Sequence, residues 1–243
     1  MQPPTDRMSD ISNTDALSEI RVFSALDSAA KRTISASCSW HHIKQNKQII
    51  GHMDRSDEVY FLVQGIVRAI TYSVEGKEVS FRDIGPGEIF GEYAAIDGGE
   101  RSANIFALTD IFVGSLSGNA FRDVLARHPD VSLAVMQLLT QQTRDLTKRV
   151  FEFSAFAVKN RIHAELLRLA LASRPTGNAA TIENMPTHAE LASRISTHRE
   201  AITREFNALA RTGLIEKDGR NTIVTDLTAL QDMVRSFDYP AEC

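Results

Sequence analysis

A segment in the first half of the chain, FGEYAAIDGGERSANI, combines residue types that suit the binding of a sugar phosphate. Glu92 begins a short helical turn whose leading backbone N–H groups are free to bond an anion, and its carboxylate can accept from a sugar hydroxyl. Arg101 follows nine residues later and offers a permanently charged guanidinium to a phosphate, with the Ser102 hydroxyl beside it as a donor. The candidate ligand-binding residues here are Gly91, Glu92, Tyr93, Ala94, Arg101 and Ser102.

Each of these residues has a more ordinary explanation when it is taken alone. An arginine such as Arg101 is more often part of a surface salt bridge, and a glutamate such as Glu92 is more often a solvated turn residue. Their occurrence together, among stretches rich in β-branched residues, favours a shared ligand. The Gly-Pro-Gly at 85–87 predicts a turn and not a dinucleotide site, since no GxGxxG pattern follows it.

A second set of residues, in the last quarter of the chain, suits contact with DNA bases. Thr187 with Glu190, and Thr197 with Glu200, have the spacing of a capping box, so two helices are predicted to start ten residues apart. Two short helices at that spacing are typical of a helix-turn-helix, in which the start of the second helix makes the base contacts.

The predicted second helix presents Arg199, Glu200 and Arg204 within one narrow sector near its start. Arginine can form a bidentate bond with guanine, and glutamate can accept from the cytosine amino group. The alternative is that Glu200 and Arg204 form an ordinary i,i+4 surface pair. The candidate DNA-binding residues are Thr187, His188, Thr197, His198, Arg199, Glu200 and Arg204.

The sequence after this helix supports the interpretation as a DNA-binding motif. TGLIEKDGRNTIVT predicts a strand, a tight Asp-Gly turn and a second strand, which together would form the wing that flanks many helix-turn-helix motifs. Gly213 is suited to end the preceding helix in a left-handed conformation.

The elements that must position these residues change in character along the chain. Residues 15–36 predict short helices, for which Asp27 or Ser28 is a candidate cap. From 38 to 116 brief β-branched or aromatic runs alternate with turns, which is typical of a small antiparallel roll or barrel. Residues 131–155 then form a helical stretch without Gly or Pro, and 156–172 predict a further helix.

The long helical stretch carries a seven-residue repeat that favours pairing with a second copy of the chain. The alternative is a helix packed on its own domain. The two interleaved series of the repeat are Met136, Thr143, Val150 and Leu139, Leu146, Phe153.

Composition sets outer limits on function. The chain has 243 residues, 43% of them hydrophobic and 24% charged, which is typical of a globular protein. Its net charge of −4 argues mildly against DNA binding, but residues 187–220 hold six Lys or Arg and two His against five Asp or Glu. Neither a signal peptide nor a membrane span is predicted, so we expect a cytoplasmic protein. Cys38 and Cys243 are too few for a disulfide framework and lack the spacing of a metal site.

The segments GExxxxDGGERSA and STHREAITR resemble the phosphate-binding cassette and the recognition helix of the cyclic-AMP receptor (CRP/FNR) family, and the resemblance extends over about residues 20–225. It implies that Glu92 binds the ribose, that Arg101 and Ser102 bind the cyclic phosphate, and that the trio of Arg199, Glu200 and Arg204 reads a TGTGA-type half-site. The GGERSAN form is similar to Clr-type regulators of the family.

The resemblance also implies a fold and a set of partners. The expected fold is α+β: a cyclic-nucleotide-binding β-roll, or jelly-roll, with N-terminal helices at 1–130, a dimerisation helix at 131–155 and a winged helix-turn-helix at 156–243. The expected partners are cyclic nucleotide, double-stranded operator DNA, a second copy in a homodimer and RNA polymerase, with no membrane and no metal. Where family members that bind cyclic AMP offer adjacent Thr and Ser hydroxyls to the purine, this chain has Leu146 and Thr147. The loss of one hydroxyl weakens the case for recognition of the adenine amino group, so cyclic GMP is a serious second choice of effector beside cyclic AMP, which remains the first.

Two other functions remain as alternatives. The nearer is a family member that senses another ligand or is constitutively active. The more distant is a metalloenzyme of the cupin kind, which would need clustered His and carboxylate ligands, typically in an HxH pattern that this sequence lacks. His41 and His42 would point to opposite faces of a strand. We therefore expect no enzymatic activity.

Overall fold

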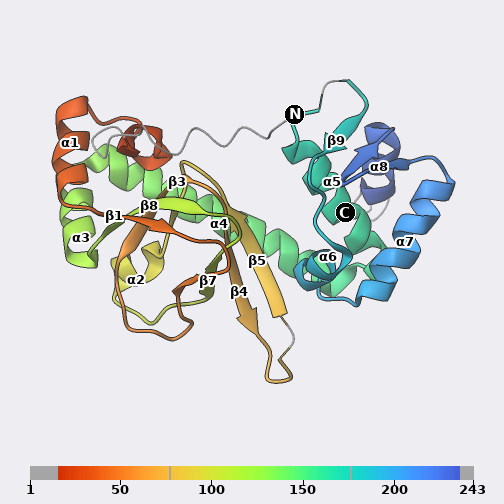
Figure 1. The fold of residues 1–243 in the computed structure, drawn as a ribbon, viewed down its shortest axis with the longest axis horizontal. Coiled ribbons are helices and arrows are strands. Elements are labelled where there is room, and N and C mark those ends of the chain that lie inside the picture. The colour runs from red at the N-terminus through yellow and green to blue at the C-terminus, as the bar shows by residue number, and fades with distance from the viewer. Residues whose placement is uncertain (1–15, 77, 176, 236–243) are drawn as a thin grey trace, which may run out of the picture. The chain divides into compact units, whose positions relative to one another are not determined.

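The computed structural model describes residues 16–76, 78–175 and 177–235, which form two compact units with the division between Gln142 and Thr143 (Figure 1). This division falls inside the helix that was predicted as a separate element at 131–155. Cys243 lies outside the described residues.

The first unit begins with short helices, as predicted. Two 3-10 helices, η1 (Ala16–Glu19) and η2 (Arg21–Phe23), precede α1 (Ser28–Ala36). Asp27 caps α1, because its side chain accepts a hydrogen bond of 2.7 Å from the backbone N–H of Ala30.

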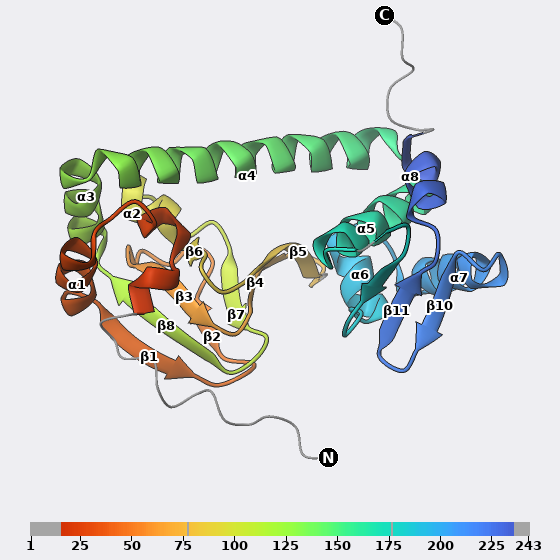
Figure 2. The same ribbon diagram turned by 90° about the horizontal axis from the view of Figure 1, so that it is seen from above.

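Two four-stranded antiparallel sheets form a β-roll after these helices (Figure 2). Strand order is β1-β8-β3-β6 in one sheet and β2-β7-β4-β5 in the other. The strands are β1 (Ser39–Ile43), β2 (Gln48–Ile50), β3 (Val59–Gln64), β4 (Val67–Tyr72), β5 (Glu78–Ile84), β6 (Ile89–Phe90), β7 (Asn104–Ala107) and β8 (Ile111–Leu116).

The roll has an apolar core on each side of its first sheet. Leu62 and Val113 of that sheet face the interior of the roll, where they pack with residues of the second sheet such as Ile105. Phe61 faces the other way and packs with Phe121 and other residues of the surrounding helices. Because neighbouring residues of a strand point to opposite faces, β3, β6 and β8 bury side chains on both sides of the sheet and are mostly apolar, whereas the edge strand β1 is largely exposed.

The first unit also contains α2 (Glu92–Asp97), α3 (Gly118–Arg127) and the first part of α4 (Pro129–Ala155). Helix α4 continues into the second unit. The first part of α4 packs on the core through Val131 and Val135, both buried, and through Leu139, which is partly buried. Helix α4 confirms the predicted uninterrupted helix to within two residues at its start.

The seven-residue repeat on α4 is exposed with one exception. Leu139 is partly buried and contacts the core of its own unit, because the roll covers one side of the first half of the helix. Its place in a seam that faces a partner stays a prediction. Four other apolar members of the repeat, together with Leu133 three residues before the first of them, remain substantially exposed: Leu133, Met136, Leu146, Val150 and Phe153.

The second unit packs helices against a three-stranded sheet of order β10-β11-β9. Its elements after the end of α4 are α5 (Val158–Ala172), β9 (Ala180–Ile182), α6 (His188–Arg194), α7 (Arg199–Arg211), β10 (Ile215–Asp218), β11 (Asn221–Val224) and α8 (Leu227–Arg235). Strands β10 and β11 confirm the predicted wing, to which β9 adds a third strand. The apolar faces of α5, α7 and α8 meet in a single core around Leu166, Ile202 and Leu230.

The two predicted capping boxes differ in outcome. At α6 the Thr187 side chain accepts from the Glu190 backbone, and the Glu190 carboxylate accepts from the Thr187 backbone N–H, so the first box is confirmed. The second, between Thr197 and Glu200, is wrong. Residue Ser196 has a φ of 52°, the backbone N–H of the buried Thr197 donates to the Ala192 carbonyl, and α7 begins one residue later with His198 in the N-cap position.

Helix α7 ends as predicted, through a glycine. Gly213 has a φ of 74°, its N–H donates to the Ala210 carbonyl, and the Leu214 N–H donates to the Leu209 carbonyl. This pair of bonds is the Schellman motif, which leads the chain directly into the wing.

Candidate functional site

Arg101 lies inside the roll with only 3% of its surface exposed. Its Nε donates to the Ser56 hydroxyl at 3.0 Å, and its two terminal nitrogens donate to the Gly91 and Glu58 carbonyls, each at 2.9 Å. The Glu58 carboxylate lies 3.5 Å from the same guanidinium. Arg101 is therefore not a surface arginine: its guanidinium is buried and is bonded to groups of its own domain, among them the Glu58 carboxylate.

Gly91 is required where the chain passes this guanidinium. Its φ is 79°, a left-handed conformation, and a Cβ at this position would lie 2.8 Å from both the Arg101 side chain and the Glu58 carbonyl. The same residue is the N-cap of α2, so a single backbone position brings Glu92 and Arg101 into one region of the roll.

Glu92 is also buried, with 4% of its surface exposed. The side-chain amide of Gln142, on α4, donates to the Glu92 carboxylate at 3.1 Å, and the Tyr93 hydroxyl donates to the Gln142 carbonyl oxygen at 2.6 Å. Burial raises the pKa of Glu92, while hydrogen bonds and the charges of Arg82 and Arg101 oppose this effect. A solvated turn residue is therefore excluded for Glu92.

The other predicted members of this site differ in exposure. Ser102 is exposed, whereas Ala94 is buried in α2 and Tyr93 is 41% exposed. Among the residues with described positions, Glu92 and Arg101 form no ion pair with each other, although both are buried in the same unit. The two oppositely charged side chains therefore have different polar partners: Gln142 for Glu92, and Ser56, Gly91 and Glu58 for Arg101.

Sequence reasoning missed three residues of this region. Ser56 and Glu58 come from the loop before β3, and Gln142 comes from α4, so all three are more than thirty residues from Glu92 in the chain. No local pattern marks them, because only the packing of the roll brings them near the cassette. Thr147 lies in the second unit, exposed on α4, and its hydroxyl donates to the Thr143 carbonyl at 2.9 Å. Its contact with a purine stays a prediction.

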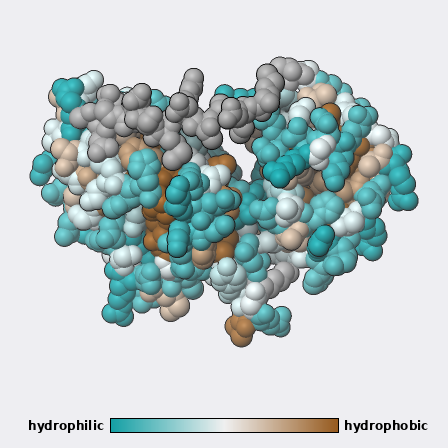
Figure 3. Space-filling view, in the orientation of Figure 1, coloured by the Kyte–Doolittle hydropathy of each residue, from teal (hydrophilic) through white to brown (hydrophobic). Residues whose placement is uncertain are grey.

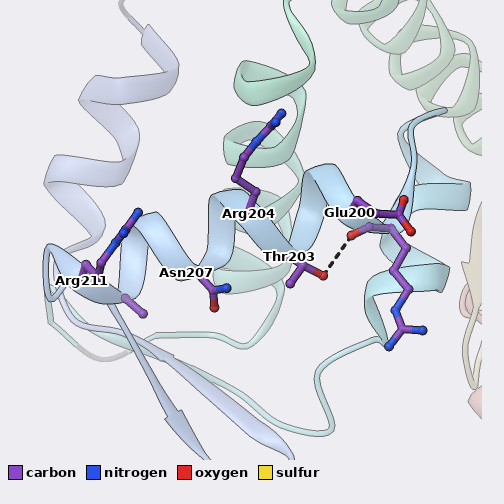
Figure 4. Close-up of a pocket in the computed structure, with 7 residues that line it drawn as sticks. Glu200, Thr203, Arg204, Asn207 and Arg211 are labelled. Atoms are coloured by element: carbon purple, nitrogen blue, oxygen red, sulfur yellow. Dashed lines mark hydrogen bonds between the residues drawn. The ribbon is translucent and has the colours of Figure 1, made fainter.

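The exposed face of α7 forms a groove in the second unit (Figure 4). Arg199, Glu200 and Arg204 lie on this face as predicted. The structure adds polar residues from later turns that sequence reasoning missed. The full lining is Arg199, Glu200, Thr203, Arg204, Asn207, Ala210 and Arg211.

Glu200 and Arg204 form no salt bridge with each other within the described part of the chain. The alternative of an ordinary i,i+4 surface pair is therefore not what the structure shows. Both side chains, with that of Arg199, are exposed and are open to an incoming partner.

The remaining predicted DNA-binding residues lie at the starts of α6 and α7. Thr187 serves as the cap of α6, and Thr197 is buried, so its side chain is not on the surface. His198 is exposed at the start of α7. His188 is half-buried, and its Nδ1 lies 2.8 Å from the Thr203 hydroxyl on α7.

Other candidate chemistry finds little support in the described ranges. They contain no group of three His, Cys, Asp or Glu residues placed to hold a metal ion. Burial raises the pKa of the Cys38 thiol to about 12, so this cysteine stays protonated at neutral pH. No helix in these ranges has the length and apolar character needed to cross a membrane.

Hydrophobic atoms on the face shown in Figure 3 gather on the roll, amid a largely hydrophilic surface. Val74, two residues after the end of β4, is fully exposed.

Comparison with known proteins places both units in recognised domain families. Residues 40–128 match the model of the cyclic nucleotide-binding domain, and residues 160–233 match that of the Crp-like helix-turn-helix domain. The first match covers the roll with Arg101, and the second covers the helices with the α7 groove.

Several relatives match this chain over most of their own length. The cyclic AMP receptor protein of Thermus thermophilus is 29% identical over 189 residues, which cover 78% of this chain and 85% of that protein. The CRP-like cAMP-activated global transcriptional regulator of Mycobacterium tuberculosis is 21% identical over 222 residues, 91% of this chain and 99% of that protein. A solved structure of a CRP/FNR-family transcriptional regulator from Thermus thermophilus has a TM-score of 0.65 and 27% identity, and covers 82% of this chain and 100% of its own.

Proposed function

Because the chain belongs to the CRP/FNR family of transcription regulators, we propose that a cyclic nucleotide bound in its β-roll controls how its helix-turn-helix binds operator DNA. The observation that carries this proposal is the pair of buried charges in the roll. Burying a carboxylate or a guanidinium is costly in free energy unless polar partners compensate for the lost water. A ligand with both an anionic phosphate and sugar hydroxyls explains why Glu92 and Arg101 are present together.

In this proposal Arg101 and Ser102 hold the cyclic phosphate, and Glu92 accepts from a ribose hydroxyl. Gly91, Tyr93 and Ala94 supply the backbone around the sugar. The guanidinium already has backbone acceptors at Gly91 and Glu58, so it is held in position before a ligand arrives. The exposed Ser102 hydroxyl is the donor nearest to solvent in this set.

Cyclic AMP is the effector we favour, with cyclic GMP as the second choice. Relatives described as a cyclic AMP receptor protein and as a cAMP-activated regulator support the first. The second stays open because Leu146 and Thr147 offer the purine a single hydroxyl.

The α7 groove supports sequence-specific DNA binding. Arg199 and Arg204 would bond guanines and Glu200 a cytosine, which corresponds to a TGTGA-type half-site. A homodimer would bring two such helices to the half-sites of a palindrome, about 34 Å apart. Four apolar residues that remain exposed on α4 support that dimer: Met136, Leu146, Val150 and Phe153.

Effector and DNA would be linked through the equilibrium between arrangements of the dimer. A coupling free energy of about 1–3 kcal/mol would give a 5- to 150-fold change in DNA affinity, and DNA would tighten nucleotide binding by the same factor. We further propose that the protein acts in the cytoplasm, with RNA polymerase as a partner.

One observation favours a second candidate, a regulator of the same family that needs no cyclic nucleotide. Three polar groups of the roll already accept from the Arg101 guanidinium: the carbonyls of Gly91 and Glu58 and the Ser56 hydroxyl. In this second candidate the role of the guanidinium is purely structural: its hydrogen bonds hold the loops around it in place. DNA binding would then be constitutive or would answer to another ligand.

Isothermal titration calorimetry with cyclic AMP and cyclic GMP separates the two candidates. We expect saturable binding to the unaltered protein and none to Arg101→Leu. The matched control is Arg55→Leu, which removes an exposed arginine from the same region and should bind as the unaltered protein does. Absence of binding by the unaltered protein, or equal binding by Arg101→Leu when both remain folded, would refute the proposed effector site.

A further inference from the structure

His188 joins the two helices of the helix-turn-helix. Its Nδ1 lies 2.8 Å from the Thr203 hydroxyl of α7, and its ring packs on Phe206, with ring centroids 5.2 Å apart. The Thr203 hydroxyl also donates to the Arg199 carbonyl at 3.0 Å. A hydroxyl has one hydrogen, so both contacts are satisfied only when the His188 Nδ1 carries a proton and donates it to Thr203.

This arrangement determines what a second proton on the ring would change. With Nδ1–H directed at Thr203, the neutral ring has Nε2 as its bare nitrogen. Protonation therefore adds a charge and a donor at Nε2 without breaking the bond between the helices. The free-energy cost of adding that proton therefore depends on the surroundings of the ring and not on the loss of the hydrogen bond to Thr203.

Those surroundings are basic. Burial, then the positive charge of Arg199 on α7 and that of Lys217 on β10, lower the pKa of His188 below its usual value. On its own helix the nearby Glu190 carboxylate is engaged with Thr187 in the capping box. His188 is therefore neutral at neutral pH: burial contributes most to this, and the positive charges of Arg199 and Lys217 add to it.

Both of those residues lie where the proposed function places DNA. Arg199 lines the α7 groove, and Lys217 belongs to the first strand of the wing. A phosphate that approaches either side chain neutralises the charge that opposes protonation of the ring. Resting on the proposed DNA-binding function, we propose that His188 takes up a proton when the protein binds its operator, so that DNA affinity rises as the pH falls.

The sign of the effect follows from linkage. The ring binds a proton more tightly in the complex than in the free protein, so its pKa is higher in the complex. DNA affinity therefore increases as the pH falls through the pKa of the complex, and it levels off below the pKa of the free protein. Between the two values affinity changes by about tenfold per pH unit for each proton taken up. A dimer with both rings coupled would show about twice that slope on a logarithmic scale.

The test measures operator affinity between about pH 5.5 and 8.5, a range that brackets ordinary histidine titration. The probe is a short duplex with inverted TGTGA half-sites, and cyclic AMP is kept at saturation. The variant His188→Asn places an amide nitrogen where Nδ1 was, so it keeps a donor toward Thr203 but cannot titrate. His41→Asn is the matched control, since His41 is an exposed histidine on β1 of the first unit and is not among the proposed DNA-binding residues.

We expect affinity to fall with rising pH in the unaltered protein and in His41→Asn, and we expect His188→Asn to lose most of that dependence. Calorimetry of the same binding in buffers of different ionisation enthalpy should show proton uptake near neutral pH that His188→Asn abolishes. A pH slope and a proton uptake that are unchanged in His188→Asn would overturn the inference. Absence of specific binding at every pH would instead refute the proposed DNA-binding function, and the inference with it.

Discussion

Replacement of Glu92 by glutamine should make the protein more stable while it weakens nucleotide binding. The carboxylate is 4% exposed, and burial raises its pKa more strongly than the hydrogen bond from Gln142 and the charges of Arg82 and Arg101 lower it. The folded protein therefore carries the cost of a desolvated charge at neutral pH. Glutamine keeps an oxygen that can accept from Gln142 at 3.1 Å, and it removes the charge.

The size of the expected gain in unfolding free energy follows from the free energy of ionising the Glu92 carboxyl group. Each pKa unit of upward shift corresponds to about 1.4 kcal/mol of lost unfolding free energy at high pH. Stabilising substitutions of this kind commonly contribute about 0.5–2 kcal/mol. For a chain of 243 residues, 1 kcal/mol raises the melting temperature by about 2–4 °C.

The pH dependence gives the sharper test. Because the pKa of Glu92 is raised in the folded state, the folded protein binds this proton more tightly than the unfolded chain does. The cost of ionisation is absent below the unfolded value of about 4.3 and fully present above the folded value. The stability advantage of Glu92→Gln should therefore be largest at neutral pH and should shrink as the pH falls.

Thermal unfolding of the two proteins across this pH range measures the advantage, and cyclic AMP titration measures the loss of binding. Glu75→Gln is the control, since Glu75 is exposed and its replacement should change stability by no more than about 0.5 kcal/mol. If Glu92→Gln destabilises the protein to the same extent at every pH, the carboxylate contributes structure and the reasoning is wrong.

Three further substitutions test other parts of the molecule. Glu200→Ala should relax preference at a single base pair by about 1–3 kcal/mol, as measured by competition among operator variants, whereas uniform weakening on all sequences would mark Glu200 as structural. Val150→Asp should shift the protein toward monomers in analytical ultracentrifugation, because it places a charge in the exposed apolar series of α4, while Lys148→Asp should leave the oligomeric state unchanged. Gly91→Ala should cost about 1–3 kcal/mol of unfolding free energy, as measured by chemical denaturation, because Gly91 has a φ of 79°. It should also reduce nucleotide affinity, because the new Cβ would meet the Arg101 guanidinium. A variant with unchanged stability and affinity would show that the loop can move away.

Local patterns in the sequence were sufficient where neighbouring residues decide the conformation. The cap at Asp27, the capping box of Thr187 with Glu190 and the left-handed Gly213 each act within a few residues, and all three are confirmed. The predicted capping box at Thr197 is wrong because the conformation of the residue before it decides where α7 begins. The turn at Ser196 takes a left-handed conformation that its own sequence does not demand, and the start of α7 moves to the next residue.

Burial was harder to predict than secondary structure. The repeat on α4 identified an apolar series correctly, but it could not separate residues that face the roll from residues left exposed, since both kinds are apolar. Leu139 packs on the core of its own unit, whereas Val150, which belongs to the same repeat further along the helix, is 64% exposed. Which side of a helix its own domain covers is a property of the fold.

The sequence by itself determined the chemistry on offer: a cassette with Glu92 and Arg101, and a helix with Arg199, Glu200 and Arg204. It did so because those residues lie close together along the chain and their spacing sets a common turn or face. Only the tertiary structure decided that Arg101 is bonded to Glu58 and Ser56, and that Gln142 reaches Glu92. These partners are distant in the chain, so only the closing of the roll, driven by burial of its apolar residues, brings them together.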